Sequence, residues 1–280
     1  MLPNEREIEE YWEVGYWVAP PLFDADEIDK AREAVLAVHS GREPEGGYPF
    51  MPPLNADKPR AVKTLMYAWY FNDVIRKMVT DPRITAIAAS LMGVDRVRLW
   101  QDQVIVKPGL ADGEPDPENN VGFHQDYSYW QDSSTTNMIT ANIVLQDTTE
   151  ANGAMRVLMG SHRFGLLEAA SHFFDPDLDR VRADYATERG SGAGERALEV
   201  LGGQVTFHHS LLVHGSGPNR SPEPRLTLAP AYFPDGARIR LDDHPESPHR
   251  VLMHAPVPGS EITGKYFPLV YDGSRAGQSD

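Results

Sequence analysis

The chain has 280 residues, of which 41% are hydrophobic and 24% are charged, a composition typical of soluble globular proteins. It contains no cysteine, which excludes disulfides, thiolate zinc sites and a cysteine nucleophile. Any metal must therefore be bound by nitrogen and oxygen ligands.

The charge balance is acidic, with a formal net charge of −15 and no basic stripe. Nucleic acid and anionic membranes are therefore poor candidate partners, and we expect a small-molecule partner. The N-terminal stretch MLPNEREIEEYWEVGYW lacks the basic-then-apolar pattern of a signal peptide. No apolar run approaches the ~20 residues that cross a bilayer, so we expect a cytoplasmic protein.

The first 94 residues have mainly helical patterns. Asp24 and Glu27 have the spacing of a capping box, and the apolar positions Ile28, Val35 and Leu36 follow them. A second helical stretch over residues 72–93 is interrupted near residues 81–82, and Gly93 is a plausible end. The Pro- and Gly-rich segment 41–60 between them predicts a long loop, which we expect to act as a lid.

After residue 95 the pattern changes to short strands separated by turns, with a polar insertion over residues 168–200. This order predicts a mainly β fold with helical cover, a double-stranded β-helix (jelly-roll, cupin-like) barrel. We expect one domain over residues 1–280. It would have a helical cover over about 1–94, a jelly-roll core over about 95–235 and a C-terminal extension over about 236–280.

The stretch GFHQDYSYW, residues 122–130, contains two potential metal ligands. In a strand, alternation would place His124 and Asp126 on one face. His214, in LLVHGSG, ends an apolar strand-like run and is the candidate third ligand. Two histidines and one carboxylate form the facial triad of non-haem iron(II) oxygenases.

The other histidines need a separate interpretation. His208 and His209 compete as ligands, but neighbours on a strand point to opposite sides, so they cannot both bind one metal in the barrel. Structural roles in the core are the more common interpretation for His39 and His162. The His-x-Asp pattern alone is also frequent by chance.

Arg225 lies eleven residues after His214. If it sits on the next strand, its guanidinium can point into the same barrel, where a buried charge needs an anionic partner. A dicarboxylate such as 2-oxoglutarate meets both demands, because its keto-acid end chelates iron and its distal carboxylate pairs with Arg225. The alternative is a surface ion pair.

In this order, the motifs resemble the phytanoyl-CoA dioxygenase family of iron(II)/2-oxoglutarate oxygenases over residues 8–233. The resemblance rests on GFHQDYSYW, on ANGAMRVLMGSHRFG, where Met159 replaces the usual proline, and on GGQVTFHHSLLVHGSGPNRSPEPRLTL. It implies iron(II), 2-oxoglutarate and O2 as cofactor and cosubstrates.

The resemblance also implies residue roles. His124, Asp126 and His214 would hold iron, and Arg225 would bind the distal carboxylate of 2-oxoglutarate. The residues implied beside the cosubstrate are Gln103, Asn142 and Thr227.

The implied activity is hydroxylation of an unactivated C–H bond of a small molecule, such as a natural product, with release of succinate and CO2. Desaturation, cyclisation and epimerisation are alternatives within the enzyme class. A metal-binding cupin with isomerase or binding function is the alternative outside it. Asp126 disfavours a halogenase, and the few lysines argue against a coenzyme A thioester as substrate.

Overall fold

The computed structural model describes residues 2–110, 112, 114, 116–167, 173–175, 177–189, 194–240, 248–254 and 256–275. Its α-helices are α1 (Glu5–Val14), α2 (Ala25–Val38), α3 (Asp73–Val79), α4 (Pro82–Met92) and α5 (Leu178–Arg189). Its strands are β1 (Tyr16–Val18), β2 (Lys63–Met66), β3 (Arg96–Gln101), β4 (Gln103–Lys107), β5 (Val121–His124), β6 (Ile139–Val144), β7 (Arg156–Leu158), β8 (Glu195–Ala197), β9 (Val205–His209), β10 (His214–Ser216), β11 (Arg225–Leu228), β12 (Ala231–Pro234) and β13 (Leu269–Asp272). None of the described helices is long and apolar enough to cross a membrane.

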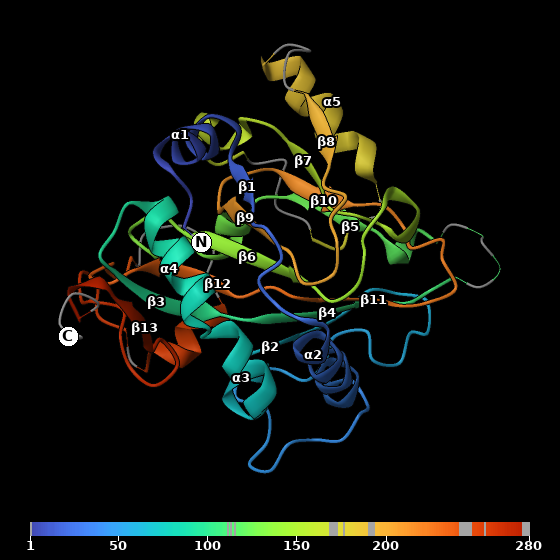
Figure 1. Cartoon of the computed structure of the whole chain (residues 1–280), viewed down its shortest axis with the longest axis horizontal. Helices are drawn as coiled ribbons and strands as arrows, with labels where there is room; N and C mark the ends of the chain where they lie inside the picture. The colour runs from blue at the N-terminus through green and yellow to red at the C-terminus, as the bar shows by residue number, and fades with distance from the viewer. Residues whose placement is uncertain are drawn as a thin grey trace.

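The strands form two antiparallel sheets (Figure 1). The larger has the order β13-β3-β12-β6-β11-β4-β2, and β9 joins it by pairing with β6 and β1. The smaller has the order β5-β10-β7-β8. Both sheets contribute residues to one cavity, so they form the two walls of a curled barrel. The predicted mainly β jelly-roll with helical cover is confirmed.

The helices begin and end where the sequence predicts. The capping box of α2 is present, because Asp24 Oδ1 accepts from the Glu27 N–H at 2.9 Å and Glu27 Oε2 accepts from the Asp24 N–H at 3.0 Å. The predicted interruption separates α3 from α4, and Gly93 ends α4 with a φ of 67°. Leu36, predicted to be apolar contact surface, is instead 49% exposed, since α2 buries its other face.

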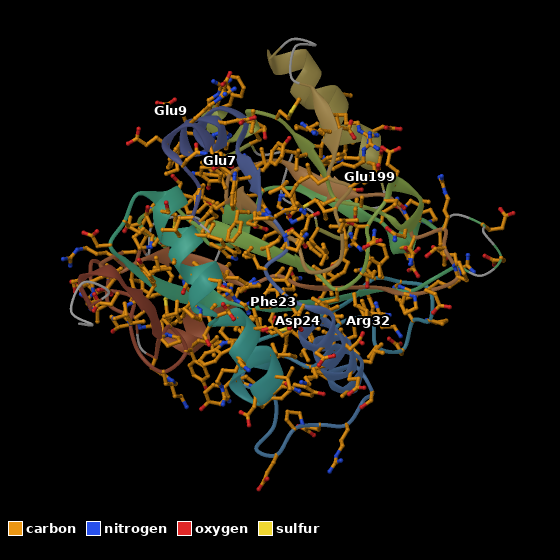
Figure 2. The ribbon with its side chains drawn as sticks, viewed as in Figure 1. Glu7, Glu9, Phe23, Asp24, Arg32 and Glu199 are labelled. Carbon is orange, nitrogen blue, oxygen red and sulfur yellow. The ribbon has the colours of Figure 1, made fainter. Side chains whose placement is uncertain are left out.

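Side chains also attach the helices to the sheet. Figure 2 shows Phe23, Asp24 and Arg32 close together at α2. The Arg32 guanidinium donates to Leu145 O at 3.0 Å, just after the end of β6. The predicted helical cover is also not purely helical, because β1 and β2 pair with β9 and β4 of the large sheet.

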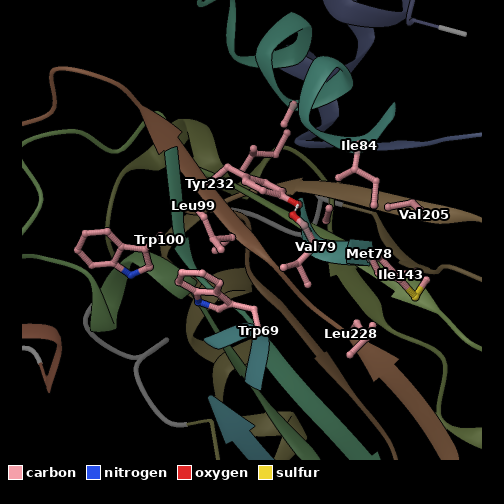
Figure 3. Close-up of a cluster of buried hydrophobic side chains, with 14 of the residues drawn as sticks. Trp69, Met78, Val79, Ile84, Leu99, Trp100, Ile143, Val205, Leu228 and Tyr232 are labelled. Carbon is pink, nitrogen blue, oxygen red and sulfur yellow. Dashed lines mark hydrogen bonds between the residues drawn. The ribbon is translucent and has the colours of Figure 1, made fainter. Parts of the chain in front are cut away.

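A buried apolar cluster packs the helices onto one face of the large sheet (Figure 3). It includes Val79 of α3, Leu99 of β3 and Leu228 of β11. Tyr232 of β12 crosses this layer and donates its hydroxyl proton to Val79 O at 2.7 Å. The rigid packing of this face fixes the strands whose other face lines the barrel.

Alternation along the strands separates apolar from polar side chains. In β11, Leu226 and Leu228 lie in the helix-facing core, while Arg225 lines the barrel cavity. In β6, Ala141 lies in the same core, while its neighbour Asn142 lines the cavity. The large sheet therefore has an apolar outer face and a polar inner face.

Asp102, between β3 and β4, makes stability depend on pH. Its side chain is fully buried, Oδ1 accepts from the Trp69 N–H at 3.3 Å, and burial raises the pKa of Asp102 to about 7. The unfolded carboxyl titrates near 4, so folding takes up a proton between about pH 4 and 7. The free energy of unfolding therefore loses about 1.4 kcal/mol per pH unit from this group as the pH rises through that window.

We expect Asp102→Asn to remove this loss, because the amide keeps an acceptor for Trp69 and carries no charge. Urea denaturation from pH 5 to 8 should show the variant gaining stability over wild type with rising pH. Between pH 5 and 8 this gain should be about 3 kcal/mol, because the loss in wild type ends near the folded pKa of about 7. Asp29→Asn, on the exposed face of α2, is the control and should leave the pH dependence unchanged. A constant difference between Asp102→Asn and wild type would show that Asp102 is ionised throughout.

Candidate metal centre and cavity

His124, Asp126 and His214 converge at the inner surface of the barrel. One ligand atom from each lies within 4.8 Å of the others. Nε2 of His124 is 3.5 Å from Asp126 Oδ1, and Nε2 of His214 is 3.7 Å from the same oxygen. Cis ligands of an octahedral metal lie about 3 Å apart, so small side-chain movements bring these atoms around one ion.

The two histidines are cross-strand neighbours. His214 is the first residue of β10 and pairs in register with His124, the last residue of β5. Their ring centroids are 4.3 Å apart. The prediction that His214 ends a strand is wrong, since the apolar residues before it form the turn into β10. The sheet pairing nevertheless brings both imidazoles to one point.

Asp126 reaches the site by a different route from the predicted one. The strand ends at His124, and Asp126 begins a 3₁₀ helix, η3 (Asp126–Tyr129). The prediction of one continuous strand is therefore wrong. Between them, the buried Gln125 amide donates to Leu211 O at 2.6 Å and to Gly165 O at 2.9 Å, and these bonds hold the corner.

Backbone hydrogen bonds set the tautomers of both histidines. His124 Nδ1 lies 2.8 Å from Gly122 O, and His214 Nδ1 lies 2.9 Å from Leu212 O. A carbonyl oxygen only accepts, so each Nδ1 carries the proton and each Nε2 presents a lone pair. Such outer hydrogen bonds are typical of metal-binding histidines.

The electrostatics of the centre suit a cation. Burial, followed by the nearby His208 and His124, holds the pKa of His214 well below its usual range, so this imidazole is neutral. Burial alone would raise the pKa of Asp126, but the neighbouring imidazoles outweigh it and hold that pKa well below its usual range. A carboxylate and neutral imidazoles are the ligand forms that a divalent metal requires.

Arg225 and Lys107 place two cations at the inner face of the large sheet. They pair in register on β11 and β4, and both side chains are buried. Arg225 donates to Gly153 O at 2.6 Å, and its Nε has no hydrogen-bond partner. Among the described residues, no carboxylate forms an ion pair with either cation. The cavity that Arg225 lines also contains both metal-site histidines, so it can accept an anion.

Residues 11–227 match the model of the phytanoyl-CoA dioxygenase family. The chain belongs to this family. The family match confirms the resemblance found in the sequence and the prediction of a dioxygenase.

Curated relatives and solved structures agree with this assignment. The chain is 27% identical over 230 residues to a probable alpha-ketoglutarate-dependent hypophosphite dioxygenase of Stutzerimonas stutzeri, covering 80% of this chain and 76% of the relative. It is 24% identical over 237 residues to an L-proline trans-4-hydroxylase of Streptomyces griseoviridis, covering 79% and 83%. The crystal structure of a non-heme alpha ketoglutarate dependent carbocyclase from nogalamycin biosynthesis superposes with a TM-score of 0.72 and 25% identity, covering 95% and 96%.

In this member of the phytanoyl-CoA dioxygenase family, two of the three remaining predicted residues line the same cavity. Gln103 and Asn142 both line it, and Asn142 donates to Thr206 Oγ1 at 3.2 Å. Thr227 lies two residues after Arg225 on the same face of β11. Its buried hydroxyl has no hydrogen-bond partner. This orphaned hydroxyl and the free Nε of Arg225 fit a polar cosubstrate.

Sequence reasoning missed the role of His208, which lies beside Asp126. His208 on β9 and Thr140 on β6 are cross-strand partners. His208 Nε2 lies 3.2 Å from Asp126 Oδ2, and the Thr140 hydroxyl donates to the same oxygen at 2.6 Å. Because a carboxylate accepts, His208 Nε2 carries its proton there and has no lone pair for a metal. His208 therefore orients Asp126 and leaves Oδ1 for the ion.

Three further histidines, His209, His162 and His39, contact groups away from the metal centre. His209 points away from His208, as predicted, and lies 5.2 Å from the His162 ring. The Nε2 atom of His162 lies 3.1 Å from Trp12 O, and that of His39 lies 3.4 Å from Val104 O. His208 lies two residues after Thr206, the cross-strand partner of the cavity residue Asn142, and this spacing could have placed His208 on the inner face.

Proposed function

We propose that this enzyme is an iron(II)- and 2-oxoglutarate-dependent dioxygenase in which His124, Asp126 and His214 bind the iron. The observation that carries the proposal is the convergence of two unprotonated Nε2 atoms and one ionised carboxylate at an open cavity. Three protein ligands leave room for a chelating cosubstrate and O2. Bound iron, together with 2-oxoglutarate and O2, supplies the oxidising chemistry, while the protein positions the substrate and excludes water.

Arg225 is proposed to bind the distal carboxylate of 2-oxoglutarate. Its guanidinium lines the cavity, is buried and lacks an acidic partner among the described residues, and a carboxylate supplies that partner. The Thr227 hydroxyl lies on the same face of the strand and adds a donor. Gln103 and Asn142 contribute uncharged amides at the wall of this cavity.

The proposed reaction is hydroxylation of a C–H bond in a small organic molecule. Substrate, O2 and 2-oxoglutarate would give the alcohol, succinate and CO2. The proteins similar to this chain include a hydroxylase and an alpha ketoglutarate dependent carbocyclase. Desaturation, cyclisation and epimerisation with the same cosubstrate are therefore the alternative outcomes. We further propose that residues 1–280 act as one oxygenase domain. In support, Met51, His124 and His249, from its three sequence segments, line one pocket.

An anaerobic titration tests the proposal directly. Adding iron(II) and then 2-oxoglutarate to the apo protein is expected to produce the weak visible charge-transfer band of a chelated keto acid. With O2 and a turned-over substrate, succinate should form in equal amount to the product. Iron binding without this band would favour a cupin that does not use 2-oxoglutarate.

A further inference from the structure

A second hollow opens directly onto the metal centre. Its volume is about 380 Å³, within the range of small-molecule sites. It shares His124, Asp126, Gln103 and Phe173 with the smaller cavity that Arg225 lines. A molecule in this hollow would therefore lie beside the metal centre, next to the cavity that Arg225 lines. We call it the substrate pocket.

Side chains with large apolar surfaces, all but one of them aromatic or sulfur-containing, form more than half of the described lining of the substrate pocket. They come from the 41–60 loop, from β2, from the end of η3 and from the 173–174 segment. They are Met51, Leu54, Met66, Tyr129, Trp130, Phe173 and Phe174. The Phe173 N–H donates to the Tyr129 hydroxyl at 2.7 Å, which fixes two of these rings beside His124. Flat ring faces of this kind bind rings of a ligand by stacking or edge contacts.

The polar groups of the substrate pocket are uncharged. Among the described residues that line it, Thr64, Gln101, Gln103 and His249 are polar and neutral, and the only charge is Asp126 at the metal. Burial lowers the pKa of His249 to about 3, and its Nε2 donates to Gln101 Oε1 at 2.6 Å. The Gln101 amide nitrogen donates to no described residue and is therefore available to a ligand carbonyl or hydroxyl.

The lining offers no cation to an anionic ligand. No described lysine or arginine lines the substrate pocket. Arg250, which follows His249 in the chain, forms an ion pair with the buried Asp132 at 2.7 Å. A carboxylate, sulfonate or phosphate placed among these rings would lose its hydration without gaining an ion pair, which costs several kcal/mol.

We propose that the substrate is an uncharged, mostly apolar ring compound with one or two hydroxyl or carbonyl groups. Free amino acids, carboxylates and phosphates are disfavoured. This inference rests on the proposed function, because it assumes that the molecule in the pocket is oxidised at the metal.

A matched pair of fluorescent probes tests the preference. N-phenyl-1-naphthylamine is neutral, and 1-anilinonaphthalene-8-sulfonate has the same skeleton with a sulfonate. Each is titrated under nitrogen into the full chain loaded with iron(II) and 2-oxoglutarate. We expect saturable fluorescence enhancement with the neutral probe and at least tenfold weaker binding of the sulfonate.

Two lysine variants assign the binding to this pocket. Met51→Lys places a cation at the pocket. It should weaken binding of the neutral probe at least threefold and strengthen binding of the sulfonate probe. Val74→Lys is the matched control, because Val74 is an apolar residue that lines a separate hollow between α2 and α3. Equal affinities of the two probes for wild type, or an effect of Val74→Lys without one of Met51→Lys, would overturn the inference.

The visible band measured in the same samples separates the two proposals. If the charge-transfer band forms but the protein does not prefer the neutral probe, the proposed substrate class is overturned and the oxygenase proposal stands. The expected probe preference without a band supports a neutral apolar site but overturns the oxygenase proposal, and the assignment of the site's ligand as an oxygenase substrate falls with it.

Discussion

Replacing Asp126 with alanine is expected to reduce the iron(II) content of the protein to a trace and turnover by more than about a hundredfold. Losing a group that only orients a ligand costs about 10–100-fold, so losing the ligand itself should cost more. Among the described residues, the groups left without an acceptor are the Thr140 hydroxyl and the His208 N–H, so we expect the midpoint of thermal unfolding to fall by only a few degrees. Metal analysis after anaerobic loading, together with a circular-dichroism melt, measures both effects.

Two further variants make this result specific. Asp29→Ala, on the exposed face of α2, should keep full iron and full turnover. His208→Phe should keep iron binding with about 10–100-fold lower affinity, because Asp126 remains but is less well oriented. Stoichiometric iron in Asp126→Ala would contradict the ligand set and point to His208 as a replacement. Complete loss of iron in His208→Phe would make His208 a ligand.

The candidate metal ligands were predictable because their order and residue types indicate the chemistry. His124, Asp126 and His214 were selected from the sequence, and the structure brings them together. The predicted strand alternation of His124 and Asp126 was wrong, since Asp126 lies on η3 and not on the strand. Its position depends on hydrogen bonds from Gln125 to Leu211 and Gly165, which are distant in sequence. A periodicity of two does not contain that information.

Contacts between distant segments also explain what the sequence did not predict. His208 was recognised only as one of two alternatives, because its partner Thr140 lies on another strand. His249 lies in a weakly patterned segment and reaches the substrate pocket through Gln101 of β3. The 41–60 loop was predicted as a lid. Its Phe50 ring stacks on His249 at 5.8 Å, and such a contact between two loops has no local sequence pattern.

The alternation of the large sheet connects the fold with the chemistry. Its outer face is apolar and packs against helices, so the strands are held rigidly. Its inner face carries Arg225, Thr140 and His208, which would be costly to bury without partners. Asp126 accepts from Thr140 and His208, and Gly153 O accepts one hydrogen bond from Arg225. The proposed cosubstrate would supply the anionic partner that Arg225 lacks among the described residues.

Replacing Arg225 with methionine is expected to raise the dissociation constant of 2-oxoglutarate by about a hundredfold while leaving iron binding unchanged. A charge-assisted hydrogen bond contributes about 1.5–3 kcal/mol, and the upper end corresponds to this factor. Titration of the visible band against 2-oxoglutarate measures the effect. Arg220→Met, at an exposed position, is the matched control and should bind 2-oxoglutarate as wild type does.

The same substitution separates a binding role from a structural one. Burial lowers the pKa of Arg225 to about 10, and burial, with Arg225 as the second cause, holds the pKa of Lys107 well below its usual range. Without cosubstrate, Arg225 therefore disfavours the charged form of Lys107, and Arg225→Met removes that unfavourable effect at the cost of one hydrogen bond to Gly153. We expect the apo variant to unfold at a temperature equal to or above that of wild type, and to gain less stability from 2-oxoglutarate. A large fall in the apo unfolding temperature with unchanged 2-oxoglutarate affinity would make Arg225 a structural residue. A buried cation whose role is to bind a ligand stabilises the fold only when that ligand is bound.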